Sequence, residues 1–273
     1  MDTKIIISGS NGRMGRALIQ SVCANPNTRL VGATSHSSSP IIGQDAGNVI
    51  GISTDIMVSN SLNTVLKNTD ADVLIDFTRP EATLSYLPLC IENKIAMVIG
   101  TTGFSTTEKE EINKSSQSIP IVFSPNFSIG VNLVFALVGL ATRTLQSSYD
   151  IEIIEAHHRH KVDAPSGTAL RIGEVIAENK NVKLEDVAVY SRKGYTGERD
   201  PNAIGFSTIR GGDIIGDHTT LFATEGERVE ITHKASSRLT FANGAVHAAC
   251  WLKDKPKGLY SMQDVLNISH LAQ

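Results

Sequence analysis

The segment that decides the fold is residues 4–23, which read KIIISGSNGRMGRALIQSVC. Its first residues, Lys4 to Ser8, form a short β-branched run that predicts a strand. A glycine-rich turn follows at residues 9–15, and the apolar spacing of residues 16–23 predicts a helix that ends at Asn25-Pro26. Strand, turn and helix in this order are typical of a dinucleotide-binding unit, because glycines let the backbone approach the diphosphate at a helix N-terminus.

The glycine spacing of this turn is G-x-x-G-x-x-G rather than the commoner G-x-G-x-x-G, because Asn11 stands where one glycine would be. A glycine pattern alone is weak evidence, and a purely structural turn is the alternative interpretation. The place of this pattern between a strand and a helix favours a nucleotide site.

Between residues 29 and 123, short apolar runs alternate with helical segments. They predict strands at residues 29–34, 55–59, 71–77, 96–100 and 119–123, and helices at residues 62–67, 81–93 and 107–115. Residues 37–51, rich in Ser, Gly and Pro, are expected to form a loop over the cofactor. The alternation implies a Rossmann-like parallel sheet with helices on both faces, which binds ligands at the carboxyl ends of its strands.

The loops at those strand ends therefore supply the candidate cofactor-binding residues. They are Gly9, Ser10, Asn11, Gly12, Arg13, Met14, Gly15, Ser35, His36, Phe77, Thr78, Gly100, Thr101, Thr102, Ser124, Pro125, Asn126 and Phe127.

The end of the second predicted strand bears on the choice of cofactor. An NAD-specific fold usually presents an acidic side chain to the ribose there, whereas this chain has Thr34-Ser35-His36-Ser37-Ser38. A 2′-phosphate would meet no like charge there, and Arg13 and His36 could approach it. We therefore expect NADPH to be accepted, and NADH as an alternative cofactor remains open.

The second informative segment is residues 152–170, EIIEAHHRHKVDAPSGTAL. It predicts a half-buried strand that delivers a cationic loop, residues 157–161, followed by a helix that begins near Thr168. The helix N-terminus at Gly167–Thr168 and the charge of Lys161 both attract anions. A histidine in this loop can give or take a proton near neutral pH.

Three simpler interpretations of this segment remain open. Three histidines in four residues are compatible with a metal site, but neighbouring His157 and His158 would point to opposite faces of an extended chain. The loop is also compatible with a merely solvated basic surface, and Ser166-Gly167-Thr168 with a helix cap. We expect no metal at this site.

The second half of the chain has a different pattern of predicted helices and strands. Helices are predicted at residues 130–145 and 168–179, and strands at residues 187–191, 203–210, 214–224 and 228–235. This pattern is typical of an α+β domain with a mostly antiparallel sheet, one face of which is left for a homo-oligomer to cover. Further helices are predicted at residues 238–251 and 257–268, in a segment that has room to return to the first domain.

Composition and charge exclude several classes of function. The 273 residues are 41% apolar and 19% charged, and the net charge of −3 gives no general attraction to nucleic acid. Cys23, Cys90 and Cys250 form no CxxC pair, which favours reduced thiols in the cytoplasm. We expect no signal peptide, because Lys4 leads directly into a short strand without an apolar h-region, and no membrane span, because the longest apolar stretch, residues 129–141, is too short.

These motifs resemble those of the 4-hydroxy-tetrahydrodipicolinate reductase (dihydrodipicolinate reductase) family of bacterial lysine and diaminopimelate biosynthesis. The most specific match is the run from Glu155 to Thr168, which fits the family signature without a gap. Residues 9–15, 76–80, 100–104 and 126–128 match as well, so that the resemblance covers essentially the whole chain.

The resemblance implies roles for individual residues. His157 becomes the proton donor, Lys161 the second catalytic residue, and His158, Gly167 and Thr168 the substrate-binding residues. It also implies a dinucleotide-binding domain of residues 1–128 and 239–273, and a substrate-binding domain of residues 129–238 through which a homotetramer forms. Some members of the family place an acidic residue at the ribose where this chain has Ser35, which agrees with the charge argument above.

The implied reaction is the NAD(P)H-dependent reduction of a small cyclic dicarboxylate, 4-hydroxy-tetrahydrodipicolinate, to tetrahydrodipicolinate. The alternatives are another two-domain dehydrogenase of a small carboxylate, a nucleotide sensor without catalysis, and a metalloenzyme. The first two do not explain the loop of residues 157–168, and the third predicts bound zinc.

Overall fold

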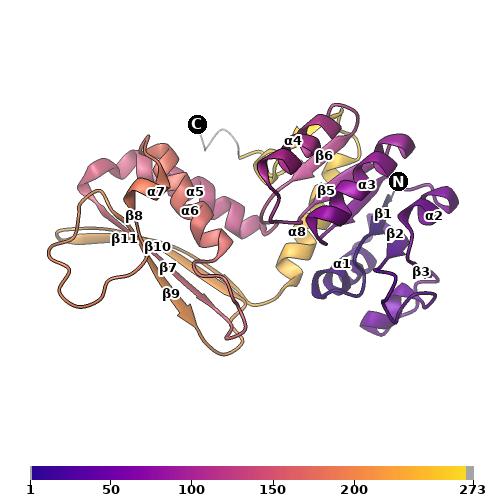
Figure 1. Ribbon diagram of the computed structural model, residues 1–273, viewed down its shortest axis with the longest axis horizontal. Coiled ribbons are helices and arrows are strands. Elements are labelled where there is room, and N and C mark those ends of the chain that lie inside the picture. Colours follow the sequence, from indigo (N-terminus) through magenta and orange to yellow (C-terminus); the bar gives the residue numbers. More distant parts are fainter. Residues whose placement is uncertain (1, 269–273) are drawn as a thin grey trace. The chain divides into compact units, whose positions relative to one another are not determined.

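The structure of the protein is a computed structural model, and it describes residues 2–268. The chain forms two compact units (Figure 1). One holds the chain up to Ile129 together with Arg238–Leu266, and the other holds Gly130–Ser237 with residues 267 and 268, which the sequence had placed in the first domain. Residues 269–273, which the sequence analysis placed in the first domain, lie outside the described residues.

The first unit is built on a seven-stranded sheet with the order β12-β6-β5-β4-β1-β2-β3, in which every pairing is parallel. Its strands are β1 (Thr3–Ile7), β2 (Thr28–Thr34), β3 (Val58–Ser59), β4 (Val73–Asp76), β5 (Ala96–Ile99), β6 (Pro120–Phe123) and β12 (Gly258–Tyr260). Its helices are α1 (Arg13–Ala24), α2 (Leu62–Asn68), α3 (Pro80–Asn93), α4 (Thr106–Ser115), α8 (Leu239–Leu252) and α9 (Met262–Val265), with a 3-10 turn at Ala46–Ile50.

Alternation along the central strand explains why both faces of this sheet are covered. Ile5 and Ile7 of β1 join one apolar cluster with residues of α1 and α8, whereas Ile6 points the other way and joins a cluster with residues of α2, α3 and α4. All three isoleucines are fully buried. A β-branched run without polar breaks is what a central parallel strand requires, and it holds the strand end, and with it the glycine-rich turn, in place.

The second unit is built on a five-stranded mixed sheet with the order β11-β10-β7-β9-β8. Its strands are β7 (Asp150–His157), β8 (Ala188–Val189), β9 (Ile204–Arg210), β10 (Gly216–Thr224) and β11 (Glu227–Ala235). The pairings of β10 with β11 and with β7 are antiparallel, whereas those of β9 with β7 and with β8 are parallel. The helices α5 (Ile129–Leu145), α6 (Gly167–Asn179) and α7 (Leu184–Val187) lie on one side of it (Figure 1). A 3-10 turn, Gln146–Ser148, follows α5. The predicted fold class, a Rossmann-like parallel-sheet domain and an α+β domain, is thus confirmed.

Several predicted elements were wrong in detail. Residues 257–268 are not one helix, because residues 258–260 pair in parallel with β6 at the sheet edge, and Ser261 then starts α9 by donating to the carboxylate of Asp264. Residues 187–191 give only the two-residue strand β8, and residues 55–59 only β3. The strand predicted to end before the cationic loop continues through His157, because its pairing with β9 extends to Arg210.

Candidate active site

The glycine-rich turn leaves its backbone open at the start of α1. The N-terminus of α1 has no side-chain cap and no acidic residue in its first turn. Gly9 has a φ of +65°, which favours glycine, and a Cβ at Gly15 would lie 2.2 Å from the carbonyl oxygen of Gly9. The side chains that would fill this space are thus absent, and the helix N–H groups suit the diphosphate of a dinucleotide.

A buried carboxylate organises the loops at the neighbouring strand ends. Asp76, the last residue of β4, is completely buried and accepts hydrogen bonds from the hydroxyls of Ser8, Thr78, Thr83 and Thr101. The hydroxyl of Thr101 in turn accepts from the backbone N–H of Thr78 at 2.9 Å. Four hydroxyl donors compensate the charge, and they tie the turns after β1, β4 and β5 to one point.

A pocket of ≈ 480 Å³ opens beside these loops. Its lining includes Gly9, Ser35, His36, Phe77, Thr78 and Arg79. The imidazole Nδ1 of His36 lies 2.8 Å from the hydroxyl of Ser38. Five of these six are candidate cofactor residues that the structure brings together, and Arg79 is a cation that the sequence analysis did not consider.

In the second unit, strand β7 sets two functional side chains on one face. The buried residues of β7 alternate, as Ile151, Ile153, Glu155 and His157. The two isoleucines pack in the apolar core together with residues of α5 and α6. Further along the same face the isoleucines give way to Glu155 and then to His157, so that the carboxylate and the imidazole lie next to each other at the end of the strand.

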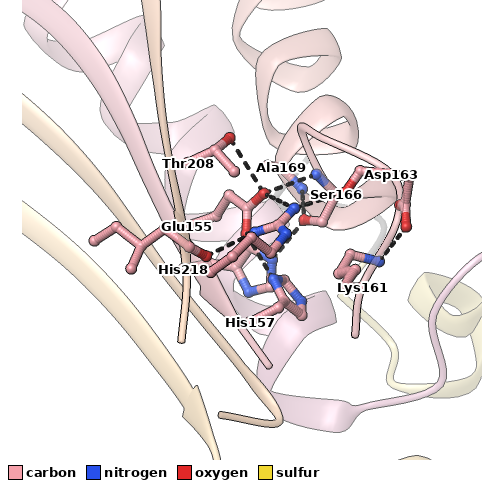
Figure 2. A network of polar contacts seen from close by, with 10 residues as sticks. Glu155, His157, Lys161, Asp163, Ser166, Ala169, Thr208 and His218 are labelled. Atoms are coloured by element: carbon pink, nitrogen blue, oxygen red, sulfur yellow. Dashed lines mark hydrogen bonds and ion pairs between the residues drawn. The ribbon is translucent and has the colours of Figure 1, made fainter. Parts of the chain in front are cut away.

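Glu155 is the centre of a polar network, shown in Figure 2. Its carboxylate lies 2.6 Å from Nδ1 of His157, accepts two hydrogen bonds of 2.8 Å from the guanidinium of Arg210, and accepts one of 3.0 Å from the backbone N–H of Ser166. Thr208 lies at the edge of the network, 3.4 Å away. Burial alone would raise the pKa of Glu155, but these donors lower it to about 2.

His157 is the best candidate for a proton donor. Burial lowers the pKa of His157, and the hydrogen bond to Glu155 opposes that effect. Among residues 2–268 no group bonds to its other nitrogen, Nε2, and a Cβ at Gly216 would lie only 3.0 Å from it. The absence of a side chain at Gly216 therefore keeps Nε2 accessible.

Ser166, His218 and Lys161 complete the surroundings of His157. Ser166 caps α6 by accepting from the N–H of Ala169, and its hydroxyl lies 3.0 Å from Nε2 of His218. The ring of His218 packs edge-on against that of His157, and burial lowers the pKa of His218 to about 3, so that it stays neutral. Lys161 forms an ion pair of 2.9 Å with Asp163 (Figure 2), which holds the pKa of Asp163 below its usual range although burial opposes this.

Two family descriptions match almost the whole chain. Residues 3–127 match "Dihydrodipicolinate reductase, N-terminus", and residues 130–266 match "Dihydrodipicolinate reductase, C-terminus". The chain belongs to the dihydrodipicolinate reductase family. The resemblance drawn from the sequence motifs is therefore confirmed.

Relatives within this family are similar over their full length. A 4-hydroxy-tetrahydrodipicolinate reductase from Laribacter hongkongensis is 60% identical, and the alignment covers 98% of this chain and 99% of the relative. One from Neisseria meningitidis serogroup B is 57% identical, with 98% of each chain covered.

Among solved structures, a dipicolinate-bound dihydrodipicolinate reductase from Paenisporosarcina sp. TG-14 is 25% identical, with a TM-score of 0.77, 97% of this chain and 99% of that chain covered. An amine dehydrogenase from Mycobacterium smegmatis is 14% identical with a TM-score of 0.60, covering 96% of this chain and 95% of that chain, and it shares the fold alone.

Sequence reasoning about this family site missed the residues that hold His157. Glu155 was placed in a strand and in the family signature but given no role in the site, and Arg210, Gly216 and His218 were not considered. One signal was present, because residues 155 and 157 are two apart on a predicted strand and must share a face. The remaining proposed substrate residues, His158, Gly167 and Thr168, lie on the loop and helix start that follow β7.

No described group of His, Cys, Asp and Glu side chains has the arrangement needed to hold a metal ion. Within residues 2–268, no helix has both the length and the apolar content that crossing a membrane requires.

Proposed function

We propose that this chain catalyses the NAD(P)H-dependent reduction of 4-hydroxy-tetrahydrodipicolinate to tetrahydrodipicolinate, a step of lysine and diaminopimelate biosynthesis. Membership of the reductase family supports it. The observation that carries it is the pairing of His157 with Glu155 beside a helix N-terminus and Lys161. This arrangement combines a proton donor with groups that bind carboxylates.

The reaction needs one hydride and one proton. Loss of the 4-hydroxyl as water leaves a conjugated C=C–C=N system, and reduction adds the hydride to one carbon and the proton elsewhere in that system. When bound, the nicotinamide supplies the hydride and leaves as NAD(P)⁺. His157 supplies the proton from Nε2, a step typically worth ~10²–10⁴-fold in rate.

We further infer that the substrate carboxylates bind at the start of α6. Gly167 and Thr168 offer backbone N–H groups there, and His158 and Lys161 add donors and charge. Lys161 is held by Asp163 in this structure, so that its ammonium is already oriented, and it offsets negative charge as it develops on the substrate.

We assign the cofactor to a dinucleotide-binding domain of residues 1–128 and 239–273, and the substrate to a domain of residues 129–238. Of the eighteen cofactor residues proposed from the sequence, fifteen lie in the loops that follow β1, β2, β4, β5 and β6, and Arg13, Met14 and Gly15 form the first turn of α1. We propose that NADPH is bound at least as well as NADH, because Ser35 brings no negative charge and His36 and Arg79 line the same pocket.

We propose a homotetramer in the cytoplasm. The face of the second sheet opposite α5 and α6 carries Ile154, Leu221 and Ile209, and Ile209 is 51% exposed. A second copy that covers this face would bury these side chains. A monomeric mass by light scattering would contradict this proposal.

The test of the function is oxidation of NADPH or NADH at 340 nm, with substrate made in situ from pyruvate and aspartate semialdehyde by the preceding synthase. Turnover with either cofactor is the expected result, and the ratio of the two kcat/KM values tests the cofactor preference. Measurable cofactor binding without turnover would refute the proposed reaction. His157→Gln and Lys161→Ala variants that turn over as fast as the wild type would refute the proposed roles of these residues.

A further inference from the structure

Glu155 has more strong contacts than a structural ion pair requires. It is 1% exposed, and its two oxygens bond to groups from three places in the chain: Arg210 at the end of β9, Ser166 at the cap of α6, and His157 on its own strand. Arg210 is itself held by the carbonyl oxygens of Ile209 and Asp163, at 2.8 Å and 2.6 Å. The carboxylate therefore has very little freedom to move.

The charge state of Glu155 decides the tautomer of His157. With a pKa of about 2, the carboxylate is ionised near neutral pH and can only accept hydrogen bonds. The contact of 2.6 Å therefore requires a proton on Nδ1 of His157. The second proton of the imidazolium, the one that can be transferred, is then on Nε2, the nitrogen that Gly216 leaves accessible.

Resting on the proposed function, we propose that Glu155 is the positioning residue for the proton donor. Clamped by Arg210 and by the N–H of Ser166, its carboxylate holds Nδ1–H of His157 and directs Nε2 toward the bound substrate. The proton that leaves Nε2 forms the new bond to the substrate, and the imidazole that remains keeps its proton on Nδ1. A proton from solvent then restores the imidazolium.

The other charged groups around His157 make this carboxylate necessary. Lys161 and Arg210 are cations, and both lower the pKa of His157, as does burial. His218, whose ring packs against His157, stays neutral and gives no compensation. Glu155 is the anion that raises the pKa of His157 and so favours the imidazolium needed for proton donation.

The chain offers a matched control on the same strand. Glu152 is paired with two arginines, Arg192 at 2.8 Å and Arg199 at 3.0 Å, but it points to the opposite face of β7, away from His157. Glu155→Gln and Glu152→Gln therefore both break ion pairs between a carboxylate and arginine. Only Glu155→Gln also removes the anion beside the proposed proton donor.

The experiment compares kcat, the KM for NADPH and the pH profile of kcat/KM for the wild type and both variants, with thermal melting as a check of folding. For Glu155→Gln we expect kcat to fall about 10²-fold, as for loss of an oriented general acid, with an unchanged KM for NADPH. A general acid is active when protonated, so the descending limb of its pH profile should move to lower pH. For a Glu152→Gln variant that keeps the oligomeric state of the wild type by light scattering, we expect neither effect.

Equal effects of the two substitutions, or an unmoved limb, would overturn the inference. If Glu155→Gln does not fold, Arg210→Lys replaces the guanidinium, which donates two hydrogen bonds to Glu155, with a single ammonium. This variant should still lower kcat several-fold at constant KM for NADPH. An unchanged kcat in that variant would count equally against it.

A measurement independent of turnover separates this inference from the proposed function. The ¹⁵N spectrum of the wild-type protein, with the His157 signals assigned by comparison with His157→Gln, should show the neutral ring protonated on Nδ1. An Nε2-protonated ring would overturn the inference even in an active enzyme. Absence of wild-type turnover, with the ring protonated on Nδ1, would instead refute the proposed reaction alone.

Discussion

Replacement of Gly216 by alanine tests the geometry around His157 with a single methyl group. A Cβ at this position would lie 3.0 Å from Nε2 of His157, 3.5 Å from its Cδ2 and 3.6 Å from Cε1 of His218. The first of these distances is roughly 0.5 Å short of the lower end of the 3.5–4.0 Å range that non-bonded heavy atoms prefer. The imidazole would have to shift by about that amount, against its hydrogen bond of 2.6 Å to Glu155.

The expected cost of this shift follows from its size. A displacement of 1 Å can cost ~10²-fold in rate, so that half of it corresponds to about 10-fold in kcat, or ~1.4 kcal/mol in the activation free energy. The added methyl group also covers part of the approach to Nε2. The KM for NADPH should not change, because the cofactor residues belong to the other unit.

The assay is steady-state turnover at 340 nm at saturating NADPH, with thermal melting to confirm that the variant is folded. Gly211→Ala is the matched control, because a Cβ at Gly211 would meet nothing within 4 Å although the residue is bonded to the backbone of His157. A folded Gly216→Ala variant with the kcat of the wild type would refute the placement of Nε2 as the reactive nitrogen.

Three other predictions concern separate parts of the molecule. Asp76→Asn leaves one acceptor oxygen for four hydroxyl donors and should cost about 2–3 kcal/mol of stability in urea denaturation, and an unshifted midpoint would contradict this. Gly15→Ala sets a Cβ 2.2 Å from a backbone oxygen and should weaken NADPH binding at least ~10-fold in a fluorescence titration. Unchanged NADPH binding would show that the turn is not the diphosphate site. His218 has its pKa lowered from 6.5 to about 3, so the unfolded chain binds a proton there that the folded chain excludes. The free energy of unfolding should therefore decrease as the pH falls from 6.5 toward 3, and it should decrease less for His218→Asn. Melting temperatures that fall equally with pH for both proteins would refute this prediction.

Much of the first unit was predictable because its signals are local. The glycine-rich turn, the buried run Ile5 to Ile7 and the strand end at Asp76-Phe77 are each read from neighbouring residues, and a parallel sheet brings such strand ends to one edge. Residues 258–260 were mistaken for helix, since only their pairing with β6 makes them a strand. The stabilising partner of such an edge strand lies more than a hundred residues away and leaves no mark on its sequence.

The same limit applies to the active site of the second unit. His157 and Lys161 belong to one sequence motif and were found from it, whereas Arg210 and Gly216 reach His157 only through the register of β9 and β10 beside β7. That register pairs His157 with Arg210 across a parallel ladder, and one residue of slippage would point Arg210 away from Glu155. The strand pattern E-x-H is thus necessary for the carboxylate–imidazole pair but does not specify its clamp. The clamp follows from the order of the strands in the sheet, which no local pattern in the sequence encodes.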